Sequence, residues 1–188
     1  MGAIAELSVA SHRFSREQYE RMIDAGVFGP EDRLELLDGE IIEMAPQKSR
    51  HATAVRLIER VLGLAFGPNF DVRSQLPLQL SEHSEPEPDI AVVIGSPRDY
   101  RDAHPATAVL VVEVSEATRT YDRGRKLSAY ARAGIPEYWI LDVVGETLEV
   151  CRHPTGEDYA ERRILKAGDS VSPQAAPTAT IAVVDLLP

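Results

Sequence analysis

A single charged residue interrupts the apolar run VLVVEVS, which spans residues 109–115. Glu113 stands between Val112 and Val114, in a short continuous apolar segment of the kind that forms a buried strand. A buried carboxylate without a partner costs several kcal/mol, so it pairs with a cation, binds a metal or takes up a proton. We therefore expect one of these partners opposite Glu113.

This run begins a strand–helix–strand unit. Residues 121–134 have a helix-forming pattern, with Thr120 or Asp122 as the expected N-cap and Gly134 at the end. Residues 137–144, EYWILDVV, predict a second buried strand. A helix between two buried strands is typical of a crossover connection, so the sequence predicts an α/β fold with a mixed central sheet flanked by helices.

Two helices and a hairpin are expected upstream of this unit. The first helix is predicted over residues 14–29 with Ser15 as its N-cap. The dipeptide Asp38-Gly39 lies between two apolar runs and favours the tight turn of a β-hairpin. Residues 49–67 have apolar side chains at helical spacing, and they predict an amphipathic helix that begins at a cap on Ser49 and ends at Gly67. Further β segments are predicted at residues 70–81, 89–95, 146–154, 157–169 and 179–188.

The composition limits the classes of protein to which the chain can belong. The chain has 188 residues, 44% of them apolar, with no repeat or linker, which predicts one domain over residues 1–188. No apolar run reaches the roughly 18 residues of a membrane span, and the N-terminal segment lacks the pattern of a signal peptide. The single cysteine, Cys151, excludes an internal disulfide and suits a reducing compartment. We therefore expect a cytoplasmic protein with no membrane partner.

The charged residues are unevenly distributed. The formal net charge of -10 argues against a nucleic-acid partner, because phosphate binding depends on Lys and Arg. However, residues 48–60 and 119–132 are rich in bases, whereas the loop at residues 81–89 carries acids and no Lys or Arg. Each basic cluster alone is typical of a solvated helix face, but two of them beside an acidic loop favour contact with phosphates. The candidate DNA-binding residues are Arg50, Arg56, Arg123 and Arg125.

A possible metal site follows from two neighbouring strands. Asp89 opens one buried strand and Glu113 lies in the next, so the two carboxylates could share a hard divalent cation. Lys126, on the following helix, could reach the same place and stabilise a phosphorane-like transition state. Two purely structural alternatives remain open. Asp89 could cap a loop, and Lys126 could be the surface partner of Asp122, four residues before it.

Several motifs in order resemble a known family. The motifs are LELLDGEIIEMAP at residues 34–46, SRHATAV at 49–55, EPEPD at 85–89, EVS at 113–115, DRGRKLSAY at 122–130 and GIPEYWILD at 134–142. Together they resemble the Uma-two family, which belongs to the PD-(D/E)xK restriction-endonuclease-like superfamily. The resemblance implies a restriction-endonuclease-like fold with an N-terminal β-hairpin, C-terminal β segments and a Mg²⁺ or Mn²⁺ site at one edge of the sheet.

The resemblance also implies roles for single residues. Asp89 and Glu113 match the motif carboxylates and would be metal ligands. The superfamily lysine stands two residues after the glutamate, where this chain has Ser115, so Lys126 on the next helix would take its place.

Two residues receive supporting roles from the same resemblance. His51 would contact the nucleophilic water or a phosphate, and Glu40 would complete the metal shell. The alternatives are a packed helix residue for His51 and a solvated hairpin carboxylate for Glu40.

Two classes of function fit these observations. The first is a Mg²⁺-dependent endonuclease that hydrolyses DNA phosphodiester bonds and acts as a homodimer, as paired cuts in a duplex would require. The second is a catalytically inactive relative that keeps the fold for binding or assembly, for which the acidic net charge is the best argument.

Overall fold

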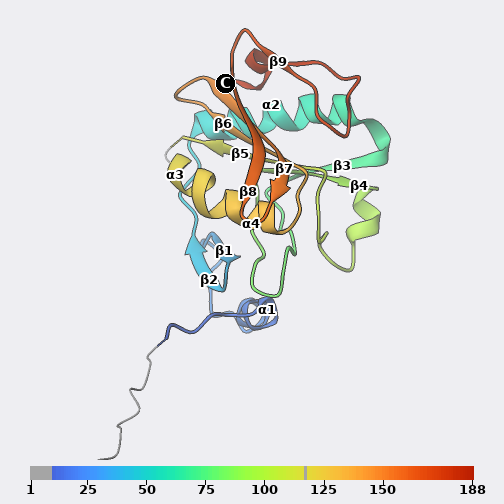
Figure 1. Ribbon diagram of the computed structural model, residues 1–188. Coiled ribbons are helices and arrows are strands. Elements are labelled where there is room, and N and C mark those ends of the chain that lie inside the picture. The colour runs from blue at the N-terminus through green and yellow to red at the C-terminus, as the bar shows by residue number, and fades with distance from the viewer. Residues whose placement is uncertain (1–9, 117) are drawn as a thin grey trace, which may run out of the picture.

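The computed structural model of the chain describes residues 10–116 and 118–188 (Figure 1). The expectation about a signal peptide falls largely on residues 1–9, which lie outside the described residues. In chain order the elements are α1 (Arg16–Asp24), β1 (Leu34–Leu37), β2 (Glu40–Glu43), α2 (Ser49–Phe66), η1 (Gly67–Asn69), β3 (Phe70–Ser74), β4 (Ile90–Ile94), η2 (Pro97–Tyr100), β5 (Leu110–Ser115), α3 (Arg119–Tyr121), η3 (Asp122–Lys126), α4 (Leu127–Arg132), β6 (Glu137–Asp142), β7 (Thr147–Thr155), β8 (Asp158–Lys166), β9 (Ser170–Val171), β10 (Ile181–Ala182) and η4 (Val183–Leu186).

Six strands form the central sheet in the order β3-β4-β5-β6-β7-β8. Strands β5 and β6 are parallel, and the other neighbouring pairs in this sheet are antiparallel. The parallel pair is connected by α3, η3 and α4, which follow one another without a break and form the predicted crossover. The predicted α/β class with a mixed sheet, an N-terminal hairpin and C-terminal β segments is therefore confirmed.

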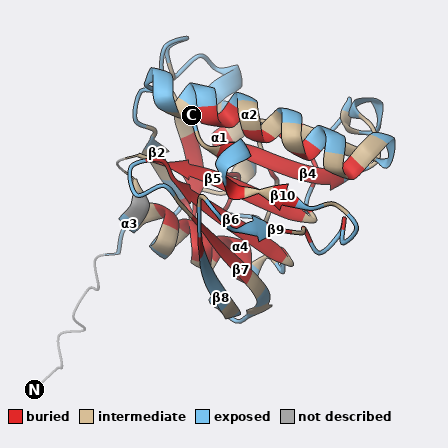
Figure 2. Ribbon diagram, turned by 90° about the horizontal axis from the view of Figure 1, so that it is seen from above, coloured by how far each residue is buried: buried red, intermediate tan, exposed pale blue. Residues whose placement is uncertain are grey.

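Helices cover both faces of this sheet, with α2 on one face and α4 on the other (Figures 1 and 2). Val112 and Val114 of β5 pack in the core under α2, whereas Val111 packs in the core under α4. Side chains alternate between the two faces of a strand, so Glu113 points to the same face as Val111. The carboxylate is thus directed towards the crossover helix and its Tyr130.

Strands β1 and β2 form the predicted hairpin, which lies with α1 below the central sheet in Figure 1. Asp38 and Gly39 have positive φ angles of 51° and 77°, as the tight turn of a hairpin requires. A Cβ on Gly39 would lie only 2.6 Å from the Cβ of Arg13, so the turn excludes a larger residue there. A bridge between Leu36 and Glu85 connects the hairpin to the acidic loop.

Of the predicted helix N-caps, only Ser15 is confirmed. Ser15 caps α1 through a reciprocal capping box with Gln18, as predicted. The expected cap on Ser49 is wrong, because Lys48 occupies the N-cap and its side chain makes no capping bond. The crossover helix begins at Arg119, before either of its expected caps, Thr120 and Asp122.

The predicted β segments at residues 70–81 and 179–188 are shorter in the structure. Strand β3 ends at Ser74, because Gln75 has a positive φ of 53° and turns the chain away from the sheet. Near the C-terminus only Ile181–Ala182 is a strand, and a short 3₁₀ helix follows it. Within the described part of the chain, no helix is long and apolar enough to cross a membrane.

Candidate functional site

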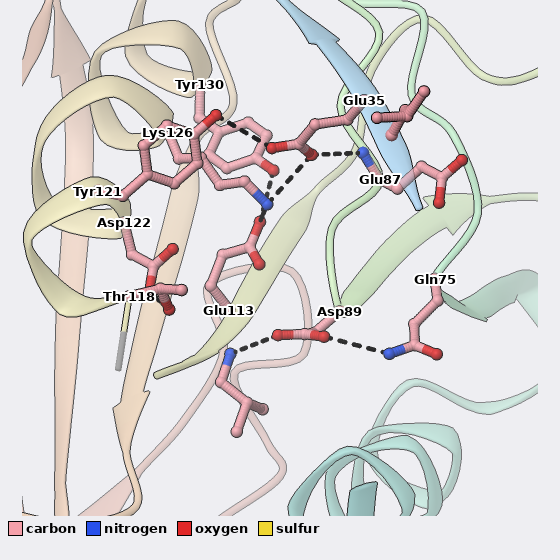
Figure 3. Close-up of polar contacts among 12 residues, drawn as sticks. Glu35, Gln75, Glu87, Asp89, Glu113, Thr118, Tyr121, Asp122, Lys126 and Tyr130 are labelled. Carbon is pink, nitrogen blue, oxygen red and sulfur yellow. Dashed lines mark hydrogen bonds and ion pairs between the residues drawn. The ribbon is translucent and has the colours of Figure 1, made fainter. Parts of the chain in front are cut away.

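A cavity of about 500 Å³ lies where Asp89, Glu113 and Lys126 come together (Figure 3). One wall is formed by β2 and the segment that follows it. Other lining residues come from Asp89 just before β4, the end of β5 and the η3 turn. The hairpin therefore closes over the edge of the sheet at which the two carboxylates lie.

The partner of Glu113 is a lysine. The Nζ of Lys126 donates to Oε1 of Glu113 at 2.9 Å, and the hydroxyl of Tyr130 donates to the same oxygen at 2.7 Å. Glu113 is 3% exposed and Lys126 is 5% exposed. Lys126 is therefore buried, and the alternative of a surface pair with Asp122 does not hold.

A second buried carboxylate, Glu35 of β1, also contacts this lysine. The Nζ of Lys126 lies 3.3 Å from Oε2 of Glu35, and the hydroxyl of Tyr121 donates to Oε1 at 3.1 Å. The backbone N–H of Glu87 donates to Oε2 at 3.1 Å. Glu35 was not among the site residues expected from the sequence, although it stands between two leucines in the run LELL, which is the same signal that drew attention to Glu113.

The shape of the crossover helix aligns these contacts. Residues Asp122–Lys126 form a π-helical turn, whose wider i→i+5 spacing places Tyr121 and Lys126 on one face. Tyr130 follows Lys126 by four residues in α4 and so continues that face. The π turn thereby directs three polar side chains at Glu35 and Glu113.

The carboxylate of Asp89 is held by three groups. Its Oδ2 accepts a 2.8 Å hydrogen bond from the backbone N–H of Val114, the residue directly after Glu113. Its Oδ1 accepts from Nε2 of Gln75 at 3.3 Å (Figure 3). The same oxygen lies 2.8 Å from Nε2 of His51. Asp89 is thus fixed beside the strand that carries Glu113, and Gln75 has a role here that no pattern in the sequence indicated.

Burial determines how these groups ionise. It raises the pKa of Glu113 to about 8, against the opposing charge of Lys126 and with the support of Asp89. Burial alone lowers the pKa of Lys126, but the charges of Glu113 and Glu35 outweigh it and hold that pKa well above its usual range. Burial also raises the pKa of Asp122 to about 6, although a 2.7 Å hydrogen bond from Thr118 opposes the shift.

Glu40 does not lie with this cluster. Its side chain is 49% exposed, and its Oε2 lies 2.8 Å from Nη1 of Arg125. The carboxylate that the hairpin brings to Lys126 is that of Glu35 on the preceding strand. The two glutamates belong to paired strands, but Glu35 is buried against Lys126 whereas Glu40 is exposed beside Arg125.

The four arginines expected to bind DNA contact other parts of the chain. Arg123 pairs with Glu149 at 2.6 Å, and Arg125 pairs with Glu40. Arg50 donates to the carbonyl of Val143 at 3.0 Å, and Arg56 pairs with Glu59 at 3.0 Å. The side chain of Arg56 is 79% exposed, so it is far more accessible than those of Arg123 and Arg125, at 35% and 39%.

A divalent cation at this site would need oxygen donors. Mg²⁺ is bound through one or two carboxylates, with water and substrate oxygens completing its shell. Asp89 and Glu113 both line the cavity and supply such carboxylates. Within residues 10–116 and 118–188, no group of three or more His, Cys, Asp or Glu side chains is arranged to hold a metal ion. The pair therefore fits a cation that keeps several non-protein ligands.

The fold agrees with the comparisons to known proteins. A family model named Uma2 and described as "Putative restriction endonuclease" matches residues 16–184. The chain therefore belongs to the Uma2 family, as its motifs indicated. No curated protein matches the chain.

A solved structure supports the fold. It is described as "a putative nuclease belonging to DUF820 from Anabaena variabilis ATCC 29413", and it superposes with a TM-score of 0.72. The match covers 92% of this chain and 97% of that one at 17% sequence identity. At this identity the likeness establishes a shared fold.

Proposed function

We propose that this protein is a Mg²⁺- or Mn²⁺-dependent endonuclease that hydrolyses DNA phosphodiester bonds. The observation that carries the proposal is the convergence of Asp89, Glu113 and Lys126 on one cavity, with Lys126 bonded to Glu113 at 2.9 Å. Membership of a family described as restriction endonucleases supports the reaction class. The whole chain, residues 1–188, would act as one domain in the cytoplasm.

Asp89 and Glu113 would hold the cation. When bound, it supplies a Lewis acid for a phosphoryl oxygen and lowers the pKa of water. His51 has a positioning role, because its imidazole contacts Oδ1 of Asp89 and leaves Oδ2 to the backbone of Val114. This arrangement restrains Asp89 on both oxygens before any ligand enters.

Lys126 would supply positive charge to the phosphate as negative charge develops on its oxygens. Glu113 and Glu35 keep the ammonium protonated, since they raise its pKa. Glu35 therefore has a role in this proposal that Glu40, at the other strand of the hairpin, does not share.

Binding of DNA requires free positive charge. Arg50, Arg56, Arg123 and Arg125 remain the candidates, although the last two would have to exchange Glu149 and Glu40 for phosphates. Because one acidic chain presents few free bases, we expect a homodimer that brings two such helix faces together.

The decisive experiment is a cleavage assay at low salt with Mg²⁺ or Mn²⁺ on supercoiled plasmid and on a labelled single strand, run beside a DNA-binding assay. Asp89→Asn and Lys126→Met should each reduce cleavage by at least about a hundredfold. Asp102→Asn is the matched control, because Asp102 is exposed in a loop and its ion pair is with the neighbouring Arg101.

The second candidate is an inactive module that keeps the fold for binding or assembly. The pairing of Arg123 and Arg125 with acids, together with the net charge of -10, favours it. If the unaltered protein neither cuts nor binds plasmid or single-stranded DNA with either cation, the nuclease proposal is wrong and the inactive module stands.

A further inference from the structure

Access to the candidate catalytic groups is narrow. Asp89 is 8% exposed, Glu113 3% and Lys126 5%. A scissile phosphate can reach them only by entering the cavity beneath the hairpin, since all three line it. The substrate must therefore present a phosphate that can enter this cavity without being held back by the bulk of the rest of the molecule.

The size of the cavity limits what can enter. Its volume of about 500 Å³ falls within the roughly 300–1,000 Å³ of pockets that enclose small molecules. A nucleotide of an unpaired strand is of that size, whereas a duplex presents its phosphates along the outside of a wide, stiff cylinder. The cavity accordingly fits one nucleotide at a time.

Part of the cavity lining is apolar. Ile42, Met44, Ala45 and Pro46 line the cavity from β2 and the segment that follows it. Such side chains can pack against the face of a base, which is exposed only when the base is unpaired and unstacked. The cavity therefore combines the candidate metal ligands with an apolar surface on which a base can lie.

Few cations line the cavity. Among the described residues its Lys and Arg side chains are Arg33, Lys48 and Lys126, and Lys126 is buried against Glu113 and Glu35. Glu43 and Glu87 also line the cavity and add negative charge. A duplex needs many phosphate contacts for its affinity, and this lining does not supply them.

We propose that the site acts on an unpaired DNA strand, such as a single strand or a flap, and admits one nucleotide into the cavity. Its base would lie against Ile42, Met44 and Pro46, and its phosphate would lie beside Lys126 and the cation that Asp89 and Glu113 would hold. This inference rests on the proposed nuclease function and specifies its substrate. An intact duplex is the competing substrate.

The test compares one labelled sequence as a single strand and as a duplex with closed ends. With Mn²⁺, the single strand should be cut at least about tenfold faster. Equal or faster cutting of the duplex would overturn the inference while leaving the nuclease function intact. Binding is measured separately by fluorescence anisotropy in Ca²⁺, and preference for the duplex, or no binding of the single strand, also overturns the inference.

A charged variant at the apolar surface makes the test specific. Ala45 is exposed at the cavity wall, so Ala45→Glu should fold and should weaken single-strand binding in Ca²⁺ by about tenfold or more, because a base that lies there would have to desolvate the new carboxylate. Ala103→Glu is the matched control, because Ala103 is exposed in a loop outside the cavity. An equal effect of both variants, or no effect of Ala45→Glu, would contradict the assignment of the base to this wall. The melting temperatures of both variants confirm that each is folded.

Discussion

The ammonium of Lys126 lies 2.9 Å from Oε1 of Glu113, in the buried space between β5 and the crossover helix. The two residues are thirteen positions apart, and the connection between them runs out of the strand and into the helix. The same ammonium lies 3.3 Å from Glu35, which comes from the hairpin. Lys126 thus joins three parts of the fold, and its removal should affect both stability and reaction.

Lys126→Met should abolish cleavage and leave DNA binding nearly unchanged, because the proposed role of the ammonium is in the transition state. It should also lower the free energy of unfolding by roughly 3–5 kcal/mol at alkaline pH, since Glu113 and Glu35 lose their buried partner. Urea denaturation and a binding assay measure the two effects. Arg101→Ala is the control, because its pair with Asp102 is highly exposed and should contribute about 1 kcal/mol or less. Cleavage that survives in Lys126→Met would remove the lysine from the mechanism.

Mn²⁺ affinity should fall as the pH is lowered. Burial raises the pKa of Glu113 to about 8, so its carboxylate takes up a proton below that pH and must release it to bind the cation. The expected loss is about tenfold per pH unit below the pKa. Titration calorimetry from mildly alkaline to mildly acidic pH gives the profile, and Glu113→Gln should bind weakly with little dependence on pH. A flat profile in the unaltered protein would exclude Glu113 as a ligand.

The raised pKa of Glu113 also makes the stability of the metal-free protein depend on pH, and this dependence runs opposite to that of metal affinity. Because the folded pKa of Glu113 lies above its ordinary value of 4.5, the folded state binds the proton more tightly than the unfolded chain. This contribution to stability is fully present below the unfolded pKa and is lost as the pH rises through about 8. Metal binding should therefore stabilise the protein most at alkaline pH, which thermal melts with and without Mn²⁺ can measure.

His51→Ala should weaken Mn²⁺ binding by about 10- to 100-fold, as the loss of a group that orients a metal ligand commonly does. The imidazole lies 2.8 Å from Oδ1 of Asp89, and only the longer 3.3 Å bond from Gln75 would remain on that oxygen. Gln75→Ala should have the smaller effect for that reason. Equal affinities in His51→Ala and the unaltered protein would indicate that Gln75 and the backbone of Val114 are sufficient to fix Asp89.

The π turn can be tested at Gly124, which is exposed and where an added Cβ would meet no heavy atom within 4 Å outside its own neighbourhood. Gly124→Ala should stabilise the helix by about 0.5–1 kcal/mol and keep activity. Insertion of one alanine after Gly124 should abolish cleavage, because Tyr121 and Lys126 would then be six residues apart and would no longer share a face. Circular dichroism and the cleavage assay distinguish the two variants. Activity in the insertion variant would show that the alignment of Tyr121 with Lys126 is dispensable.

Local patterns in the sequence determined most of the elements and the first members of the site. The apolar run around Glu113, the strand after Asp89, the turn at Asp38 and Gly39 and the cap on Ser15 all depend on neighbouring residues, so they can be read from the chain. The same reasoning failed at Ser49, where Lys48 occupies the N-cap without a side-chain bond. Local signals are weak at such ends because contacts elsewhere decide where a helix begins.

Only the tertiary structure determined which charged side chains form ion pairs. Lys126 could pair with Asp122 on a surface or with Glu113 in the core, and the covering of β5 by the crossover helix produced the second result. The pairing of β1 with β2 brought Glu35 to the lysine and left Glu40 outside with Arg125. These contacts join segments far apart in the chain, and no spacing in the sequence encodes them, because they depend on how the sheet, the helix and the hairpin pack against one another.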